Sequence, residues 1–133
     1  MASIFSKIVA GDIPCHRVAE SEDFLAFLDI MPLVHGHVLV IPKQEIDRMW
    51  DLEPQLLGRL HQFSQEVALA IERAVPCQRV GQAVIGLEVP HAHIHLIPLQ
   101  NVADINFERP KRHVTQEELA EMAEKLRASF ASV

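Results

Sequence analysis

The chain has 133 residues, of which 49% are hydrophobic and 5% aromatic, with no tyrosine. This length and composition predict a single domain with an aliphatic core. The net charge of −6 argues against nucleic acid as a partner. There is no run of 18 apolar residues and no signal-peptide pattern, so we expect a cytoplasmic protein without a membrane partner.

The first half of the chain combines short strand signals with one long helix signal. Residues 24–28 and 37–41 are apolar runs of strand length, and the loop 31–36 separates them. Residues 51–54 place an acid and a proline where helices begin. Apolar residues then recur at helical spacing over 56–74. This half therefore predicts two strands followed by a long amphipathic helix.

The second half predicts two further strands and a last helix. The strands are expected near 80–85 and 90–98, with Gly86 between them. Thr115 and Glu118 form a capping-box pattern at the start of the final helix. The elements do not alternate as strand and helix, which favours an antiparallel α+β fold.

Three histidines, His91, His93 and His95, stand at alternate positions of the strand predicted over 90–98. Alternate residues of a strand share a face, so the three imidazoles line one face and the apolar residues between them line the other. Imidazole can serve as nucleophile, acid or base near neutral pH. This spacing therefore predicts a catalytic site.

A metal site is the alternative interpretation of the same histidines. His-x-His pairs on strands bind zinc. However, the first and third histidine lie roughly 13 Å apart on a strand, and one zinc needs each nitrogen at about 2.0–2.1 Å. Catalysis is therefore favoured over a three-histidine metal site, and a metal-dependent enzyme using His91 with His93 or His95 stays open.

The segment from His91 to Ile97 resembles the His-φ-His-φ-His-φ-φ signature of the histidine triad (HIT) nucleotide hydrolases and transferases. Residues 4–9 (Ile-Phe-Ser-Lys-Ile-Val), 26–30 (Ala-Phe-Leu-Asp-Ile) and 36–43 (Gly-His-Val-Leu-Val-Ile-Pro-Lys) resemble further family motifs, in the same order and at similar separations. The resemblance covers about residues 3–100. We therefore expect residues 1–133 to form a single HIT domain, in which the loop and helix over 101–131 carry no family motif.

The resemblance implies an α+β fold with an antiparallel sheet of about five strands, one long central helix and a C-terminal helix. It also implies a homodimer and a purine nucleotide substrate, closest to the purine nucleoside phosphoramidases, with no cofactor. In such enzymes, a histidine attacks the α-phosphorus and a nucleotidyl-histidine forms before water releases the nucleoside monophosphate.

The resemblance assigns a role to each of four histidines. His93 falls on the nucleophile, His95 and His37 fall on positions that contact or polarise the phosphate, and His91 falls on the position that orients the nucleophilic ring. A neutral His93 must keep one ring nitrogen free to attack, and a hydrogen bond at the other nitrogen would fix that tautomer.

The resemblance also assigns the nucleotide-binding residues. Asp29 falls on the acid that accepts the ribose hydroxyls. An apolar wall around the base and a glycine loop at the phosphate are expected to comprise Ile4, Phe5, Phe27, Ile30, Gly86, Glu88 and Val89. Ile8 is better explained as a core residue.

The chain departs from the family at a structural zinc site. Many bacterial relatives carry Cys-x-x-Cys near the N-terminus and a histidine after Pro-Lys-x, where this sequence has Ser3, Ser6 and Glu45. All three changes remove zinc ligands, so we expect no structural metal. Leu87 also replaces a frequent glutamine after the loop glycine, and Glu88 is a candidate to supply the missing polar contact.

The leading hypothesis is therefore a HIT-type hydrolase that cleaves a purine nucleotide at the α-phosphorus, with phosphoramidates or dinucleoside polyphosphates as substrates. A non-catalytic nucleotide- or partner-binding module on the same scaffold is a second hypothesis. The presence of all four motif histidines argues against it, because binding alone requires no nucleophile.

Overall fold

The computed structural model describes residues 2–131. Its centre is a five-stranded antiparallel sheet with the strand order β1-β2-β3-β5-β4. The strands are β1 (Arg17–Glu20), β2 (Phe24–Leu28), β3 (Val38–Pro42), β4 (Arg79–Ala83) and β5 (Ile94–Leu99). The helices are α1 (Ile4–Val9), α2 (Pro54–Ala74) and α3 (Gln116–Ala131), with short 3-10 turns η1 (Met49–Asp51) and η2 (Val102–Ile105). This arrangement confirms the predicted fold class.

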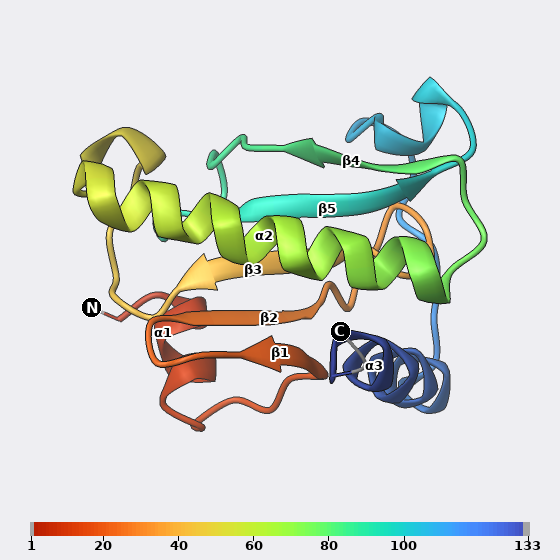
Figure 1. Cartoon of the computed structure of the whole chain (residues 1–133), viewed down its shortest axis with the longest axis horizontal. Coiled ribbons are helices and arrows are strands. Elements are labelled where there is room, and N and C mark those ends of the chain that lie inside the picture. The colour runs from red at the N-terminus through yellow and green to blue at the C-terminus, as the bar shows by residue number, and fades with distance from the viewer. Residues whose placement is uncertain (1, 132–133) are drawn as a thin grey trace.

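The two long helices occupy different places on the sheet. Helix α2 crosses one face of the sheet, while α3 lies beside the β1 edge and α1 lies behind the sheet (Figure 1). Strand β4 forms the opposite edge. No helix in the described part of the chain is long and apolar enough to cross a membrane.

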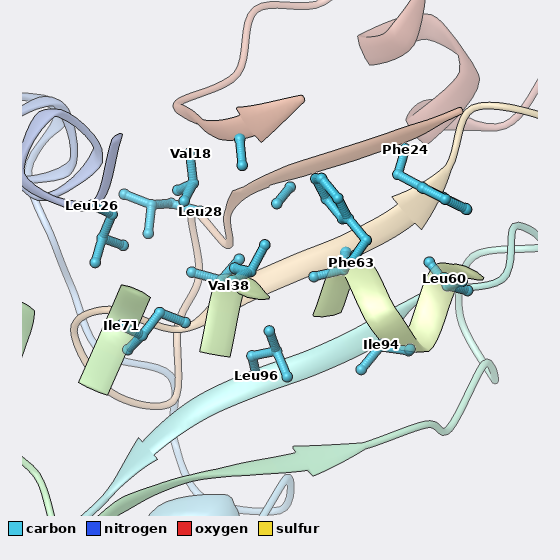
Figure 2. Close-up of a cluster of buried hydrophobic side chains, with 14 of the residues drawn as sticks. Val18, Phe24, Leu28, Val38, Leu60, Phe63, Ile71, Ile94, Leu96 and Leu126 are labelled. Atoms are coloured by element: carbon cyan, nitrogen blue, oxygen red, sulfur yellow. The ribbon is translucent and has the colours of Figure 1, made fainter. Parts of the chain in front are cut away.

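The main core lies between α2, α3 and the sheet. Val38, Ile94 and Leu96 of the central strands meet Leu60 and Ile71 of α2 there (Figure 2). Burial of one such side chain contributes roughly 1.5–3 kcal/mol. The alternation of β5 thus turns Ile94 and Leu96 toward α2 and His95 toward the opposite face of the sheet.

A second, smaller cluster fills the opposite face of the sheet. Phe5 of α1 packs there on Phe27, with ring centroids 5.5 Å apart. Helix α1 has only six residues and is capped at its N-terminus by Ser3, whose hydroxyl accepts a hydrogen bond from the Ser6 N–H at 3.0 Å. Because so short a helix is not stable alone, its position depends on this packing.

The predicted helix boundaries are close to those observed. Pro54 occupies the first turn of α2, where its missing N–H costs no hydrogen bond. At α3, the Thr115 hydroxyl accepts from the Glu118 N–H at 3.1 Å, and the Glu118 carboxylate accepts from the Thr115 N–H at 3.0 Å. These bonds confirm the capping box.

The strand predicted over 90–98 requires a correction, because β5 begins only at Ile94. The pairing of β5 with β3 begins at Ile94, which lies opposite Val40. Before that point, the Ala92 N–H bonds to the Ile46 carbonyl instead, at 2.7 Å. His91 and His93 thus lie in the segment that leads into the strand, and only His95 is in it.

Candidate active site

A cavity of about 600 Å³ opens beside α1, on the face of the sheet opposite α2. Eight of its lining residues were predicted from the sequence: Ile4, Phe5, Asp29, Gly86, Glu88, Val89, His93 and His95. Six more complete the lining: Met31, Leu39, Ile85, Leu87, Phe107 and Lys111. The structure therefore brings most of the predicted site residues to one place.

Two predicted base-wall residues do not line this cavity. Phe27 is 3% exposed and lies in the small core cluster under Phe5. Ile30 is 59% exposed, because β2 ends at Leu28 and the strand alternation no longer fixes its direction. Ile8 packs against the small cluster, as expected.

His93 is held in one tautomer by the backbone. Its Nδ1 lies 2.7 Å from the His91 carbonyl oxygen, which can only accept, so Nδ1 carries the proton. Nε2 is then unprotonated, in a ring that lines the cavity. Burial lowers the pKa of His93 and keeps the ring neutral. The Phe5 ring meets it edge-on, with centroids 5.1 Å apart.

A hydrogen-bonded chain fixes the tautomers of His37 and His95. The Leu33 N–H donates to Nδ1 of His37 at 3.1 Å, so the proton of His37 is on Nε2. That Nε2 donates to Nδ1 of His95 at 2.9 Å. The remaining proton of His95 is therefore on Nε2, which leaves an N–H donor on a ring that lines the cavity.

His91 does not line the cavity, although its carbonyl orients His93. Its ring is completely buried. Its Nε2 donates to the Pro42 carbonyl oxygen at 2.8 Å, so its Nδ1 accepts from the Ser3 hydroxyl, also at 2.8 Å. This ring ties α1 to the end of β3.

The three positions that depart from the family's zinc ligands meet at His91. The Ser6 hydroxyl donates to the Glu45 carboxylate at 2.7 Å and lies 3.4 Å from Nδ1 of His91, and the Ser3 N–H also donates to Glu45. These bonds lower the pKa of Glu45 to about 2. Two hydroxyls, a carboxylate and one imidazole do not fit structural zinc, which favours thiolates and imidazoles in such sites. Hydrogen bonds join the four side chains directly.

Asp29 is anchored at the edge of the cavity. Its Oδ1 accepts from the Met31 N–H at 2.9 Å. Desolvation raises the pKa of Asp29, although the Met31 hydrogen bond and the Lys111 charge oppose that shift. Its Oδ2 lies 3.7 Å from Nε2 of His37. Burial lowers the pKa of His37 to about 3, so His37 is neutral and the contact is not an ion pair.

Asp29, His37 and His95 also form the one histidine-containing group in residues 2–131 whose donor atoms, all within 4.8 Å of one another, could hold a metal ion. Nε2 of His37 and Nδ1 of His95 already bond to each other there. A metal at this point would have to replace that hydrogen bond. The His-x-His pair of the metal hypothesis does not form such a group.

Two lining residues, Phe107 and Lys111, lie outside every motif of the sequence. Phe107 packs edge-on against His95, with centroids 4.7 Å apart, and Nζ of Lys111 lies 5.2 Å from the Phe107 ring centroid. A signal was present: residues 109–113 read Arg-Pro-Lys-Arg-His, a basic run in an acidic chain. No motif linked that run to the histidines.

Comparisons with known proteins show the family of this chain. The HIT domain model matches residues 10–102. The adenosine 5'-monophosphoramidase of Schizosaccharomyces pombe is 36% identical over 95% of this chain and 96% of its own length. The hit protein of Bacillus subtilis is 36% identical over 76% of this chain and 73% of its own.

Solved structures show the same architecture. A Zn-bound histidine triad family protein from Mycobacterium smegmatis superposes with a TM-score of 0.85 at 30% identity, covering 99% of this chain and 95% of that one. A Hit-like protein from Bartonella henselae superposes with a TM-score of 0.83 at 31% identity, covering 96% of this chain and 95% of that one. With the family model spanning residues 10–102 and a relative 36% identical over 95% of the sequence, the chain belongs to the HIT family.

Proposed function

We propose that this protein, a nucleotide hydrolase by its family, cleaves a purine nucleotide at the α-phosphorus through a nucleotidyl-histidine on His93. The observation that carries the proposal is the bond between Nδ1 of His93 and the His91 carbonyl. It leaves Nε2 with a free electron pair in a ring that lines the cavity, and the pKa of that ring is lowered by burial. A neutral, oriented imidazole is what nucleophilic attack requires.

In the first step, Nε2 of His93 bonds to phosphorus, and the bond to the leaving group breaks. The leaving group takes the electron pair, and an amine leaving group takes a proton from solvent. In the second step, a water oxygen attacks phosphorus, the P–N bond breaks, and the nucleoside monophosphate leaves while a water proton passes to solvent. The Nε2–H of His95 donates to a phosphoryl oxygen as negative charge accumulates there.

The remaining lining residues bind the nucleoside. Asp29 accepts the ribose hydroxyls, and Ile4, Phe5 and Leu39 provide an apolar surface for the purine. Gly86 has φ of +75°, a conformation that glycine adopts without strain. It lets the loop 86–89 turn along the phosphate side of the cavity. Two yeast relatives bear the name adenosine 5'-monophosphoramidase, which supports an adenosine phosphoramidate as substrate.

The test measures AMP release from adenosine 5'-phosphoramidate and from diadenosine tetraphosphate. Substitution of His93→Ala is expected to lower kcat at least about 1000-fold, while AMP affinity measured by calorimetry changes little. His61→Ala, an exposed histidine of α2, is the matched control and should keep wild-type rates. Mass spectrometry of an acid-free quenched reaction should find the nucleotidyl adduct on His93.

Near-normal turnover by His93→Ala would contradict the assignment of the nucleophile. Nucleotide binding by the wild-type protein without any turnover of either substrate would favour the non-catalytic binding module instead.

A further inference from the structure

The segment that joins β5 to α3 closes one side of the cavity. Its residues Phe107 and Lys111 line the cavity together with His93 and His95. The Arg112 N–H donates to the Pro32 carbonyl at 2.8 Å, which fastens the segment to the loop before β3. The segment is therefore a wall of the site, although it lies outside residues 10–102, which match the family model.

Phe107 connects this wall to the histidines. Its ring lies edge-on to His95 at 4.7 Å between centroids and to His37 at 6.2 Å, with interplanar angles of 72° and 83°. Aromatic rings prefer such edge-to-face contacts. Half-buried itself, Phe107 limits how far a substrate group beside His95 can extend in this direction.

Lys111 places a positive charge next to that ring. Its Nζ lies 5.2 Å from the Phe107 ring centroid, and no carboxylate oxygen of residues 2–131 lies within 4.0 Å of it. The charge also acts on the histidines, since it helps to lower the pKa values of His37 and His95. In a chain of net charge −6, a lysine without a carboxylate partner in this cavity favours an anionic ligand group.

The depth of these residues separates two subsites. His93 and His95 are 7% and 9% exposed and form the floor, where the reacting phosphorus must lie to be attacked. Lys111 is exposed, at the rim. Its long stem and compact ammonium suit a group further along the substrate.

We propose that Phe107 and Lys111 form the subsite for the leaving group and that Lys111 selects leaving groups carrying negative charge. The anion can be a phosphate, as in a nucleoside polyphosphate, or a carboxylate, as in an amino acid joined to phosphorus through its amine. This inference rests on the proposed function and specifies the substrate class.

The experiment compares kcat/KM for three substrates that release AMP. The leaving groups are ammonia from adenosine 5'-phosphoramidate, aspartate from its N-linked AMP phosphoramidate, and ATP from diadenosine tetraphosphate. In the Lys111→Gln variant, the ratio of kcat/KM for an anionic over the neutral leaving group should fall about tenfold, a moderate effect because the lysine is exposed. Lys111→Arg should preserve most of the ratio. The anionic substrate whose kcat/KM falls more in Lys111→Gln shows whether Lys111 prefers the carboxylate or the phosphate.

Arg109→Gln is the matched control. The Arg109 guanidinium donates to the Ala103 carbonyl at 2.7 Å and lies 3.6 Å from Asp104, so its removal should leave all three rates unchanged. Equal losses on all three substrates in Lys111→Gln, or no loss on any, would overturn the inference.

Failure of the proposed function is a separate result. If the wild-type protein released AMP from none of the substrates, calorimetry would still compare the binding of AMP and ATP. Lys111→Gln should then weaken ATP binding about tenfold more than AMP binding. An unchanged ratio of the two affinities would overturn the inference by itself.

Discussion

His37 and His95, which are 58 positions apart in the sequence, share a hydrogen bond of 2.9 Å between Nε2 of one and Nδ1 of the other. Both rings are buried, and burial lowers their pKa values to about 3 and about 4. Each ring is therefore neutral at pH 7 and carries one proton, and the direction of the bond fixes where the proton of His95 is.

The free energy of unfolding is expected to decrease as the pH falls from about 6.5 to about 4. In that window, the unfolded chain protonates these histidines while the folded chain does not, so the unfolded state binds more protons. The stability that the lowered pKa values of His37 and His95 contribute is therefore present above about pH 6.5 and is lost on acidification. For His37, the loss between pH 6.5 and pH 5 is about 2 kcal/mol. The lowered pKa of Glu45 acts only below about pH 4.5, where its unfolded form begins to protonate.

Urea unfolding at pH 7 and pH 5 measures this loss. A His37→Gln variant should lose less stability between the two pH values than the wild-type protein, because it lacks one of the titrating rings. His61→Gln, at an exposed position of α2, should keep the wild-type difference. Equal pH dependence in all three proteins would show that His37 is not held neutral by the fold.

Asp29→Asn should weaken the binding of adenosine monophosphate by about 1.5–3 kcal/mol, since a neutral amide replaces a charged acceptor. The preference for the ribonucleotide over the deoxyribonucleotide should shrink as well. Calorimetric titration with both nucleotides measures the two effects. Because Asp29 also accepts from the Met31 N–H, a thermal melt of the variant must confirm that the loop is intact. Unchanged affinity and sugar preference in a folded variant would place the ribose elsewhere.

The purified protein should contain no stoichiometric zinc, and strong chelators should leave turnover unchanged. The reason is the donor set around His91, in which Ser3, Ser6 and Glu45 bond to one another and serine hydroxyls are poor zinc ligands. Elemental analysis tests this directly. The triple variant Ser3→Cys, Ser6→Cys, Glu45→His should acquire about one zinc per chain, since the three positions already converge on His91. One zinc per wild-type chain, lost together with activity, would refute the prediction.

We expect a homodimer at micromolar concentration, paired through the β4 edge. Strand β4 has an open edge and exposes Arg79 and Gln82, whereas the β1 edge lies against α3. Unpaired edges are usually covered or paired, and a twofold axis would let two copies of β4 pair. Light scattering should give the mass of a dimer. Gln82→Glu should lower the measured mass toward that of a monomer, because it adds a negative charge to each of the two paired strands. Ala120→Glu on the exposed face of α3 is the control. A monomer mass for the wild-type protein at all concentrations would refute the dimer.

The sequence predicted the elements whose signals are local. Residues 24–28 were predicted as a strand and form β2, and the capping box of Thr115 and Glu118 marks the start of α3. Helix α1 and strand β1 were not predicted as such. Six residues are too few to show helical periodicity in α1, and the four residues of β1 include only two buried ones and give no apolar run. Phe27 shows the limit for the site: its place in the motif predicted a residue of the base wall, whereas the packing of Phe5 over it makes it a core residue. Phe107 and Lys111 reach the cavity through the tertiary path of the chain, which no local pattern records.

Helix α1 has a consequence for the order in which the site forms during synthesis. Phe5 packs on Phe27, His91 and His93. Helix α1 leaves the ribosome first, but His91 and His93 are synthesised nearly ninety residues later, so its packing is completed only then. Lys111, at the far wall, emerges later still. A nascent or truncated chain that ends before His91 thus lacks the three alternating histidines and two of the three rings against which Phe5 packs, and we expect it not to bind nucleotide.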